Sequence, residues 1–277
     1  MKCLSFFRCL LFTFFLFFLL PGYARQVDTL KVYSPSMEKE LKNIVILPEG
    51  YASRPQDTYP VVYLLHGHGN NYTSWLTRIK PDLPRIATEY GMIFVCPEGE
   101  KSWYWDSPVS PKSRFETYIC YELTGEVEKH YRTRNNRNSR AISGYSMGGH
   151  GALWLAFRHP DIFGACGSMS GGVDIRPFPD NWNMKDQLGT YSGNPRRWDE
   201  HTVINQLPYK TDSGTLAIII DCGTEDFFFQ VNNQLHEKML KLKIPHDYIT
   251  RPGGHNHTYW NNAVDYQLLF FRKFFQR

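Results

Sequence analysis

Two segments near the N-terminus, 28–33 and 40–47, place apolar side chains at every second position. A period of two is typical of strands with one buried face, so these segments predict a pair of antiparallel strands. The pattern changes at 61–65 to a short continuous apolar run, as expected of a strand buried on both faces of a parallel sheet. Similar runs follow at 92–96, 139–143, 165–169, 216–221 and 247–250.

Stretches with helical periodicity separate most of these runs. They lie at 83–90, 115–131, 147–157, 231–241 and 259–275. Strands that alternate with helices predict an α/β fold: a mostly parallel central sheet with helices on both faces and the antiparallel strand pair at its N-terminal end. No repeat, low-complexity tract or linker interrupts 25–277, so we expect one domain there. In such sheets, ligands bind beyond the carboxyl ends of the strands.

Residues 1–24 have the pattern of a secretory signal peptide. Lys2 and Arg8 precede an apolar run at 9–20, and the small residues Gly22 and Ala24 stand three and one before a cut after Ala24. The run is shorter than the roughly 20 residues that a membrane-spanning helix needs. We therefore expect cleavage and an exported protein, periplasmic or extracellular, with a retained membrane anchor as the alternative.

Net charge and cysteine content say little about binding partners or disulfides. The formal net charge of +4 includes Lys2 and Arg8, so removal of the signal leaves 4 − 2 = +2, too little to indicate nucleic acid or an anionic surface as partner. The remaining cysteines lie in apolar runs, which fits buried thiols as well as disulfides, and no pairing is favoured. They are Cys96, Cys120, Cys166 and Cys222.

The run 143–149, Ser-Gly-Tyr-Ser-Met-Gly-Gly, follows a predicted strand and precedes a predicted helix. This is the context of a nucleophile elbow, in which small residues let neighbouring backbone approach an exposed serine. The same residues could form an ordinary turn packed against a helix. The context favours Ser146 as a nucleophile, which then requires an acid and a histidine base, in that order, later in the chain.

The loop that follows the strand 216–221 offers three carboxyl groups for the acid. Asp221 still belongs to the end of the strand. Glu225 comes one residue before the end of the turn 223–226, which is the position where this fold places the acid. We therefore favour Asp226 as the acid, with Asp221 and Glu225 as alternatives.

The loop 251–257 follows the last predicted strand and carries two histidines. His255 comes directly after two glycines, which let the loop fold back toward Ser146, so we favour it as the base. His257 competes for this role, but it opens a predicted helix and could simply cap the helix or pack there.

Acyl transfer also needs backbone N–H groups that point at the developing oxyanion. One is expected from Met147, the residue after the nucleophile, and the other from the loop 66–69, where we choose the N–H of His68. The loop could also be an ordinary glycine-rich turn. The alternating histidines in 66–69 and 251–257 have no carboxylate cluster or cysteine pair near them in sequence, so we expect no metal site.

Aromatic residues indicate where a substrate pocket would lie. Trp103 and Trp105 stand in a polar loop after the strand 92–96. Flat side chains suit an aromatic or sugar substrate, although they could equally fill the core beneath a loop. Trp182 belongs to the segment 177–206, between the fourth and fifth parallel strands, where lids and pockets are inserted in this kind of fold, so it is a third candidate.

Four ordered blocks resemble the esterase family of α/β-hydrolases, which includes feruloyl and acetyl-xylan esterases, S-formylglutathione hydrolases and secreted mycolyltransferases. The blocks are 63–67 with Trp75, the GYSMGGHGAL block from Gly144, the turn 223–226, and 252–255 with Trp260. The resemblance implies the α/β-hydrolase fold and the same residues chosen above: Ser146, Asp226 and His255 as catalytic triad, with His68 and Met147 as oxyanion donors. Two residues depart from it: His150, where many members carry an aromatic or another residue, and His68, where several carry leucine.

The resemblance implies a serine carboxylic ester hydrolase that works through an acyl-serine intermediate and needs no cofactor. Export argues against a glutathione thioester, a cytosolic substrate, and together with the tryptophan loop favours acetyl or feruloyl esters of polysaccharide. The alternatives are an acyltransferase, a thioesterase and, from another class, a non-catalytic carbohydrate-binding protein. The expected partner is a small or polysaccharide-linked ester, without nucleic acid and without stable membrane insertion after signal removal. The acyl group, the alcohol and the oligomeric state stay open.

Overall fold

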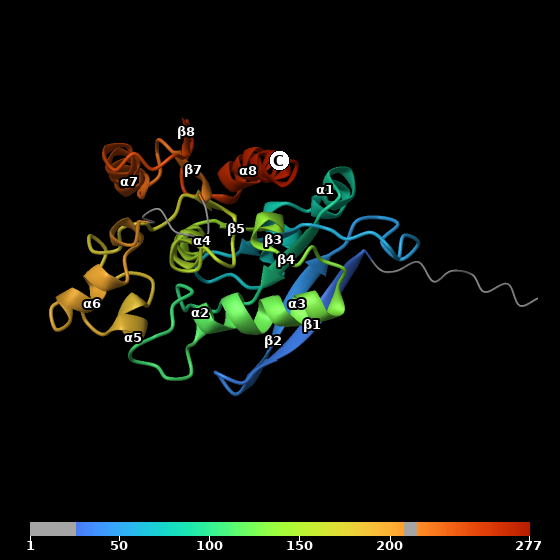
Figure 1. Cartoon of the computed structure of the whole chain (residues 1–277). Helices are drawn as coiled ribbons and strands as arrows, with labels where there is room; N and C mark the ends of the chain where they lie inside the picture. The colour runs from blue at the N-terminus through green and yellow to red at the C-terminus, as the bar shows by residue number, and fades with distance from the viewer. Residues whose placement is uncertain (1–25, 208–214) are drawn as a thin grey trace, which may run out of the picture.

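One eight-stranded sheet forms the centre of the computed structural model, which describes residues 26–207 and 215–277 (Figure 1). The strands are β1 Val27–Ser34, β2 Lys39–Ile46, β3 Val61–Leu65, β4 Ile93–Pro97, β5 Arg140–Gly144, β6 Ala165–Met169, β7 Ala217–Gly223 and β8 Asp247–Arg251. Their order across the sheet is β1-β2-β4-β3-β5-β6-β7-β8. The predicted signal peptide lies outside the described residues.

The two patterns of apolar residues correspond to the two parts of the sheet. β1 and β2 pair antiparallel, with Leu30 and Val32 buried and Lys31 exposed between them. β2 also runs antiparallel to β4, whereas β4, β3, β5, β6, β7 and β8 pair in parallel. Every residue of β3, β4 and β6 is buried, as continuous apolar runs predict. The predicted α/β-hydrolase architecture, with its N-terminal antiparallel pair, is confirmed.

Helices cover both faces of the sheet (Figure 1). Buried side chains of α1 and α8 share one core with one face, and those of the α2–α3 segment, α4 and α7 share a second core with the other face. The longer helices are α1 Leu83–Tyr90, α3 Thr124–His130, α4 Met147–Arg158, α7 Phe229–Lys241 and α8 His257–Phe275, and the shorter ones are α2 Phe115–Thr117, α5 Met184–Leu188 and α6 Pro195–Glu200. Within the described residues, no helix is long and apolar enough to cross a membrane.

The structure corrects one predicted helix and adds several short ones. The segment 115–131 is not one regular α-helix, because a π-helical stretch at Tyr118–Leu123 separates α2 from α3. Apolar periodicity does not distinguish α from π turns, because such a bulge inserts only a single extra residue into the helix. Short helical segments that the pattern did not predict occur at Trp75–Ile79, Arg137–Ser139 and Val203–Asn205, and in the region of α5 and α6.

The four cysteines of the predicted mature chain are all buried and unpaired. Burial raises the pKa of each of their thiols, which keeps them protonated and unreactive. Of the two states that the sequence left open, the structure therefore has free thiols.

Candidate active site

Ser146 lies in the sharp turn between β5 and α4. Its φ of 57° and ψ of −121° are strained for a residue with a side chain, and its N–H is held by the carbonyl of Met169 on β6 at 2.9 Å. A Cβ on Gly148 would lie 2.3 Å from the carbonyl oxygen of Leu65, so only glycine lets α4 approach β3 this closely. The turn thus has the backbone geometry expected of a nucleophile elbow.

His255 bridges Ser146 and Asp226. The three residues come from three different loops at the carboxyl ends of the strands. Ser146 Oγ lies 2.8 Å from His255 Nε2, and His255 Nδ1 lies 2.8 and 3.1 Å from the two carboxylate oxygens of Asp226. A nitrogen that faces a carboxylate carries the proton, so Nδ1 donates to Asp226 and Nε2 is free to accept from the hydroxyl. The side chain of Asp226 is fully buried, and its Oδ1 also accepts from the N–H of Phe228 at 2.8 Å.

The rival candidates for acid and base lie elsewhere. Glu225 is exposed to solvent. Asp221 is buried beneath the site, where it accepts hydrogen bonds from Tyr259 and Arg251 rather than from His255. His257 is the exposed first residue of α8, at the rim of the cavity. Of the candidates, only His255 contacts Ser146, and only Asp226 contacts His255.

The loop after β3 brings His68 to the same cavity. His66 holds this loop: its Nδ1 lies 2.9 Å from the carbonyl of Gly67, and its Nε2 accepts from the N–H of Gly99 at 2.9 Å. Within the part of the chain that the structure describes, neither the N–H of His68 nor that of Met147 donates a hydrogen bond to the protein. Both donors are therefore available to a ligand, as an oxyanion site requires.

A cavity of about 580 Å³ opens over Ser146 and has aromatic walls. Trp182 stacks on Phe227 at 5.5 Å, and Phe227 lies 4.2 Å from the ring of His255. Tyr145 and Trp260 form a second stacked pair at 4.5 Å. Trp182, a predicted pocket residue, thus lines the cavity, whereas Phe227 was missed although it directly follows Asp226.

Trp103 and Trp105 do not line this cavity, so the prediction that they are pocket residues is wrong. Their exposed fractions are 1% and 0%, and they stack on each other at 5.7 Å in the core. The loop is polar in sequence, but it folds inward, with positive φ at Trp103. Trp103 acts on the cavity indirectly, because its indole N–H donates to the carbonyl of Trp182 at 3.1 Å.

Comparison with known proteins identifies the family. The sequence model of a family described as "Putative esterase" matches residues 34–271. The chain belongs to this esterase family.

An esterase of Mycobacterium tuberculosis is 29% identical over 238 residues, 76% of this chain and 51% of that protein, so the chain spans about half the length of this relative. An acetyl esterase of Caldicellulosiruptor saccharolyticus is 24% identical over 253 residues, 84% of this chain and 92% of that protein. A solved ferulic acid esterase has a TM-score of 0.76 at 28% identity, covering 90% of this chain and 98% of its own.

His150, one of the two departures from the family pattern, lies behind the elbow of this esterase-family chain. It is fully buried among Trp103, Trp105 and Trp154, and its Nδ1 lies 3.0 Å from the carbonyl of Gly172. Burial lowers its pKa to about 3, which keeps the imidazole neutral. His150 therefore does not add polarity to the cavity, whereas His68 does, because it lines the wall.

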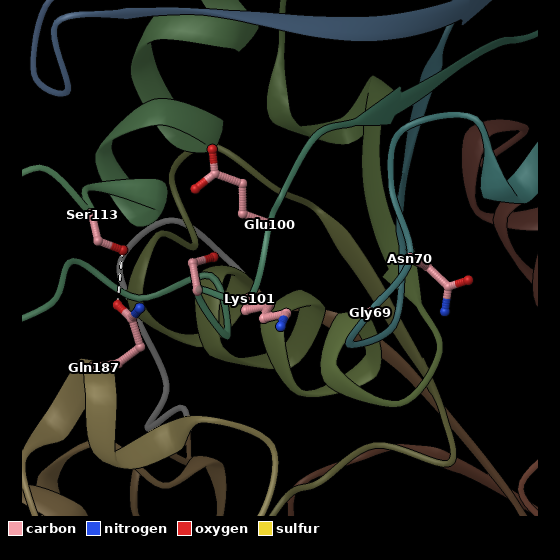
Figure 2. Close-up of a pocket in the computed structure, with 7 residues that line it drawn as sticks. Gly69, Asn70, Glu100, Lys101, Ser113 and Gln187 are labelled. Atoms are coloured by element: carbon pink, nitrogen blue, oxygen red, sulfur yellow. Dashed lines mark hydrogen bonds between the residues drawn. The ribbon is translucent and has the colours of Figure 1, made fainter.

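A second cavity of about 400 Å³ adjoins the first. Most of the residues that line it have polar side chains (Figure 2), and we call it the polar cavity. Asn70 lines both cavities. Gln187, on α5, accepts from Ser113 at 2.8 Å through its side-chain oxygen. Within the described residues, the Lys101 ammonium and the Gln187 side-chain nitrogen have no hydrogen-bond partner. The two cavities thus differ in chemistry: one has aromatic walls around Ser146, and the other offers uncommitted donors.

Proposed function

We propose that the protein is a serine carboxylic ester hydrolase that forms an acyl intermediate on Ser146. The observation that carries the proposal is the continuous chain of contacts from Ser146 Oγ through the imidazole of His255 to the buried carboxylate of Asp226. A serine hydroxyl is a poor nucleophile unless a base takes its proton, and this arrangement supplies the base and orients it. Membership of the esterase family supports the same reaction.

In the proposed mechanism, His255 Nε2 takes the proton of Ser146 as its oxygen attacks the ester carbonyl. Asp226 holds the Nδ1–H tautomer and stabilises the imidazolium that forms. The N–H groups of His68 and Met147 bind the oxyanion of the tetrahedral intermediate. His255 then gives its proton to the leaving alcohol, and a water molecule repeats the sequence to release the acid.

We infer that the acyl group binds between the aromatic walls and that the alcohol extends toward the polar cavity. Trp182 and Phe227 provide flat apolar surface beside His255, which suits an aromatic acyl group such as feruloyl as well as a small acetyl group. Lys101 and Gln187 offer donors that suit the hydroxyl groups of a sugar. Relatives named acetyl esterase and feruloyl esterase support acyl esters of polysaccharide as substrates.

Hydrolysis is favoured over acyl transfer by the open rim of the cavity over Ser146. Asn256, His257 and Thr258 line this rim and are exposed, so water has access to an acyl group on the serine. An acyltransferase has to exclude water during deacylation. Product analysis with a competing alcohol separates the two: we expect free acid to be the main product, and a dominant transfer product would favour the acyltransferase.

Substitution of the nucleophile tests the proposed reaction. We expect Ser146→Ala to lower kcat for p-nitrophenyl acetate by a factor on the order of 10⁴ to 10⁶, because no other group can form the acyl intermediate. A matched control is Ser143→Ala on β5, whose hydroxyl contacts Gln267 rather than His255. Equal rates for Ser146→Ala and the wild type would contradict the proposal. A panel of acetyl, butyryl and feruloyl esters then identifies the acyl preference.

We further propose that the protein is exported and that its mature chain starts at Arg25. The apolar run at 9–20 and the small residues before the cut support this.

A further inference from the structure

The loops that carry Asp226 and His255 are joined through their backbones. The N–H of Thr224 donates to the carbonyl of Arg251, and the N–H of Glu225 donates to that of Gly253, both at 3.0 Å. A Cβ on Gly223 would lie 2.1 Å from the carbonyl oxygen of Gly253, so the two loops are in close backbone contact. The position of His255 therefore depends on how the ends of β7 and β8 are held together.

A buried polar cluster lies directly beneath these loops. Asp221, at the end of β7, is 0% exposed. One of its oxygens accepts from the hydroxyl of Tyr259 at 2.5 Å, and the other forms an ion pair with Arg251 at the end of β8. Burial raises the pKa of Tyr259 to about 12, so its hydroxyl stays protonated and donates. The cluster joins β7, β8 and α8 at the base of the site.

Tyr259 contacts the residues on both sides of His255. On one side its ring packs against Gly253, where a Cβ would lie 2.5 Å from ring carbon Cδ2 and φ is 135°. On the other side its N–H donates at 3.0 Å to the side chain of Asn256, which caps α8. The Tyr259 hydroxyl anchors this ring to Asp221, so a shift of the ring would move Gly253, two residues before His255, while the backbone of the same residue holds Asn256, directly after it.

We propose that Asp221, Arg251 and Tyr259 form a positioning network that holds His255 at hydrogen-bond distance from both Ser146 and Asp226. The inference rests on the proposed function. The network does not touch the reacting atoms. The Asp221 carboxylate, one of the alternative acids, is neutralised by Arg251 and satisfied by Tyr259, so it does not compete with Asp226 for the histidine. Removal of one contact is expected to loosen the base, and small displacements of catalytic groups are costly in rate.

Tyr259→Phe tests the network because it removes the hydroxyl and keeps the ring on Gly253. We expect kcat for p-nitrophenyl acetate to fall about tenfold, with KM within about twofold of wild type, because alignment for proton transfer is lost while binding is not. Rates are normalised to active sites titrated with a fluorophosphonate, and melting temperatures are measured alongside. The matched control is Tyr266→Phe, whose ring lies 4.2 Å from the Arg251 guanidinium carbon but whose hydroxyl does not reach Asp221. The control is expected to keep wild-type kcat.

A double-mutant cycle separates positioning from a purely structural role. In an Asp226→Asn background, where the histidine has already lost its orienting carboxylate, Tyr259→Phe is expected to lower the remaining kcat less than about twofold. A tenfold loss in both backgrounds would overturn the proposal, as would unchanged kcat in the single variant. Should Tyr259→Phe fold poorly, Asp221→Asn serves instead, because asparagine still accepts from Tyr259 but loses the charge of the ion pair.

Failure of this inference is distinguishable from failure of the proposed function. If the proposed function is wrong, the wild type and Ser146→Ala have the same activity. If only the network is wrong, Ser146→Ala is inactive while Tyr259→Phe retains the wild-type kcat.

Discussion

Asp221 and Asp226 show how much the role of a residue depends on its immediate surroundings. Asp221, in β7, and Asp226, in the loop after it, are both buried carboxyl groups, but one faces a guanidinium and a phenol and the other faces an imidazole. A buried carboxylate is stable only where hydrogen bonds or an opposite charge satisfy it. Each therefore has a fixed set of partners, and of the two only Asp226 contacts His255, the proposed base.

The buried side chain of His150 leads to a prediction, also at the scale of a single residue, about how the stability of the fold depends on pH. Its pKa is about 3 in the folded protein against 6.5 for an ordinary histidine. Between these values the unfolded chain binds one more proton than the folded one. The free energy of unfolding therefore contains a contribution that is fully present above pH 6.5. This contribution is lost as the pH falls toward 3, by up to about 1.4 kcal/mol per pH unit.

Replacement of His150 by phenylalanine should remove this contribution. We expect the wild type to lose stability more steeply than His150→Phe between pH 6.5 and 4, measured by urea unfolding at a series of pH values. Parallel curves for wild type and His150→Phe would show that the buried histidine is not the source.

At the scale of elements, the elbow depends on direct backbone packing of α4 against β3. Gly148 and Gly125 both stand at the second position of a helix, α4 and α3 respectively. A Cβ would meet the Leu65 carbonyl oxygen at 2.3 Å from Gly148, but would meet nothing within 4 Å from Gly125. The same substitution at the two sites therefore separates helix propensity from packing.

We expect Gly148→Ala to lower the free energy of unfolding by about 1–3 kcal/mol, because the added methyl group forces α4 away from the sheet. Gly125→Ala should raise it by about 0.4–1 kcal/mol through the lower entropy of the unfolded chain. Chemical denaturation measures both. Equal shifts in the two variants would mean that α4 tolerates displacement, and the close approach would then not be required for the fold.

At the scale of the molecule, the aromatic and polar cavities bring together segments far apart in the chain. The loop after β3 lines both cavities, the loop after β4 lines the polar one, and the segment with α5 contributes Trp182 to one and Gln187 to the other. An ester linkage placed at Ser146 would then have different surroundings on its two sides. Under the proposed function, this arrangement would allow the acyl group and the alcohol to be recognised independently.

Lys101→Met tests recognition of the alcohol, because it keeps the aliphatic stem and removes the ammonium donor. We expect kcat/KM for an acetylated sugar to fall about fivefold, roughly 1 kcal/mol for one hydrogen bond, while p-nitrophenyl acetate is unaffected. Both esters form the same acetyl intermediate, so only the alcohol differs. Lys42→Met, at an exposed lysine on β2 outside the cavities, is the control. An equal loss with both esters would assign Lys101 to folding or to the acyl side.

The order of apolar patterns along the chain was sufficient to determine the α/β fold, since alternating and continuous runs reflect one-sided and two-sided burial, a local property of each strand. The local motif around Ser146 and the glycines before His255 likewise pointed to the residues that the structure brings together. Four features were decided only by the tertiary structure: the π-helical stretch, the burial of Trp103 and Trp105, the contact of Phe227 with His255, and the network around Asp221. The last three depend on which side chains meet across distant segments, and such partners leave no periodic signal in the sequence. The π-helical stretch inserts a single residue, which apolar periodicity does not register.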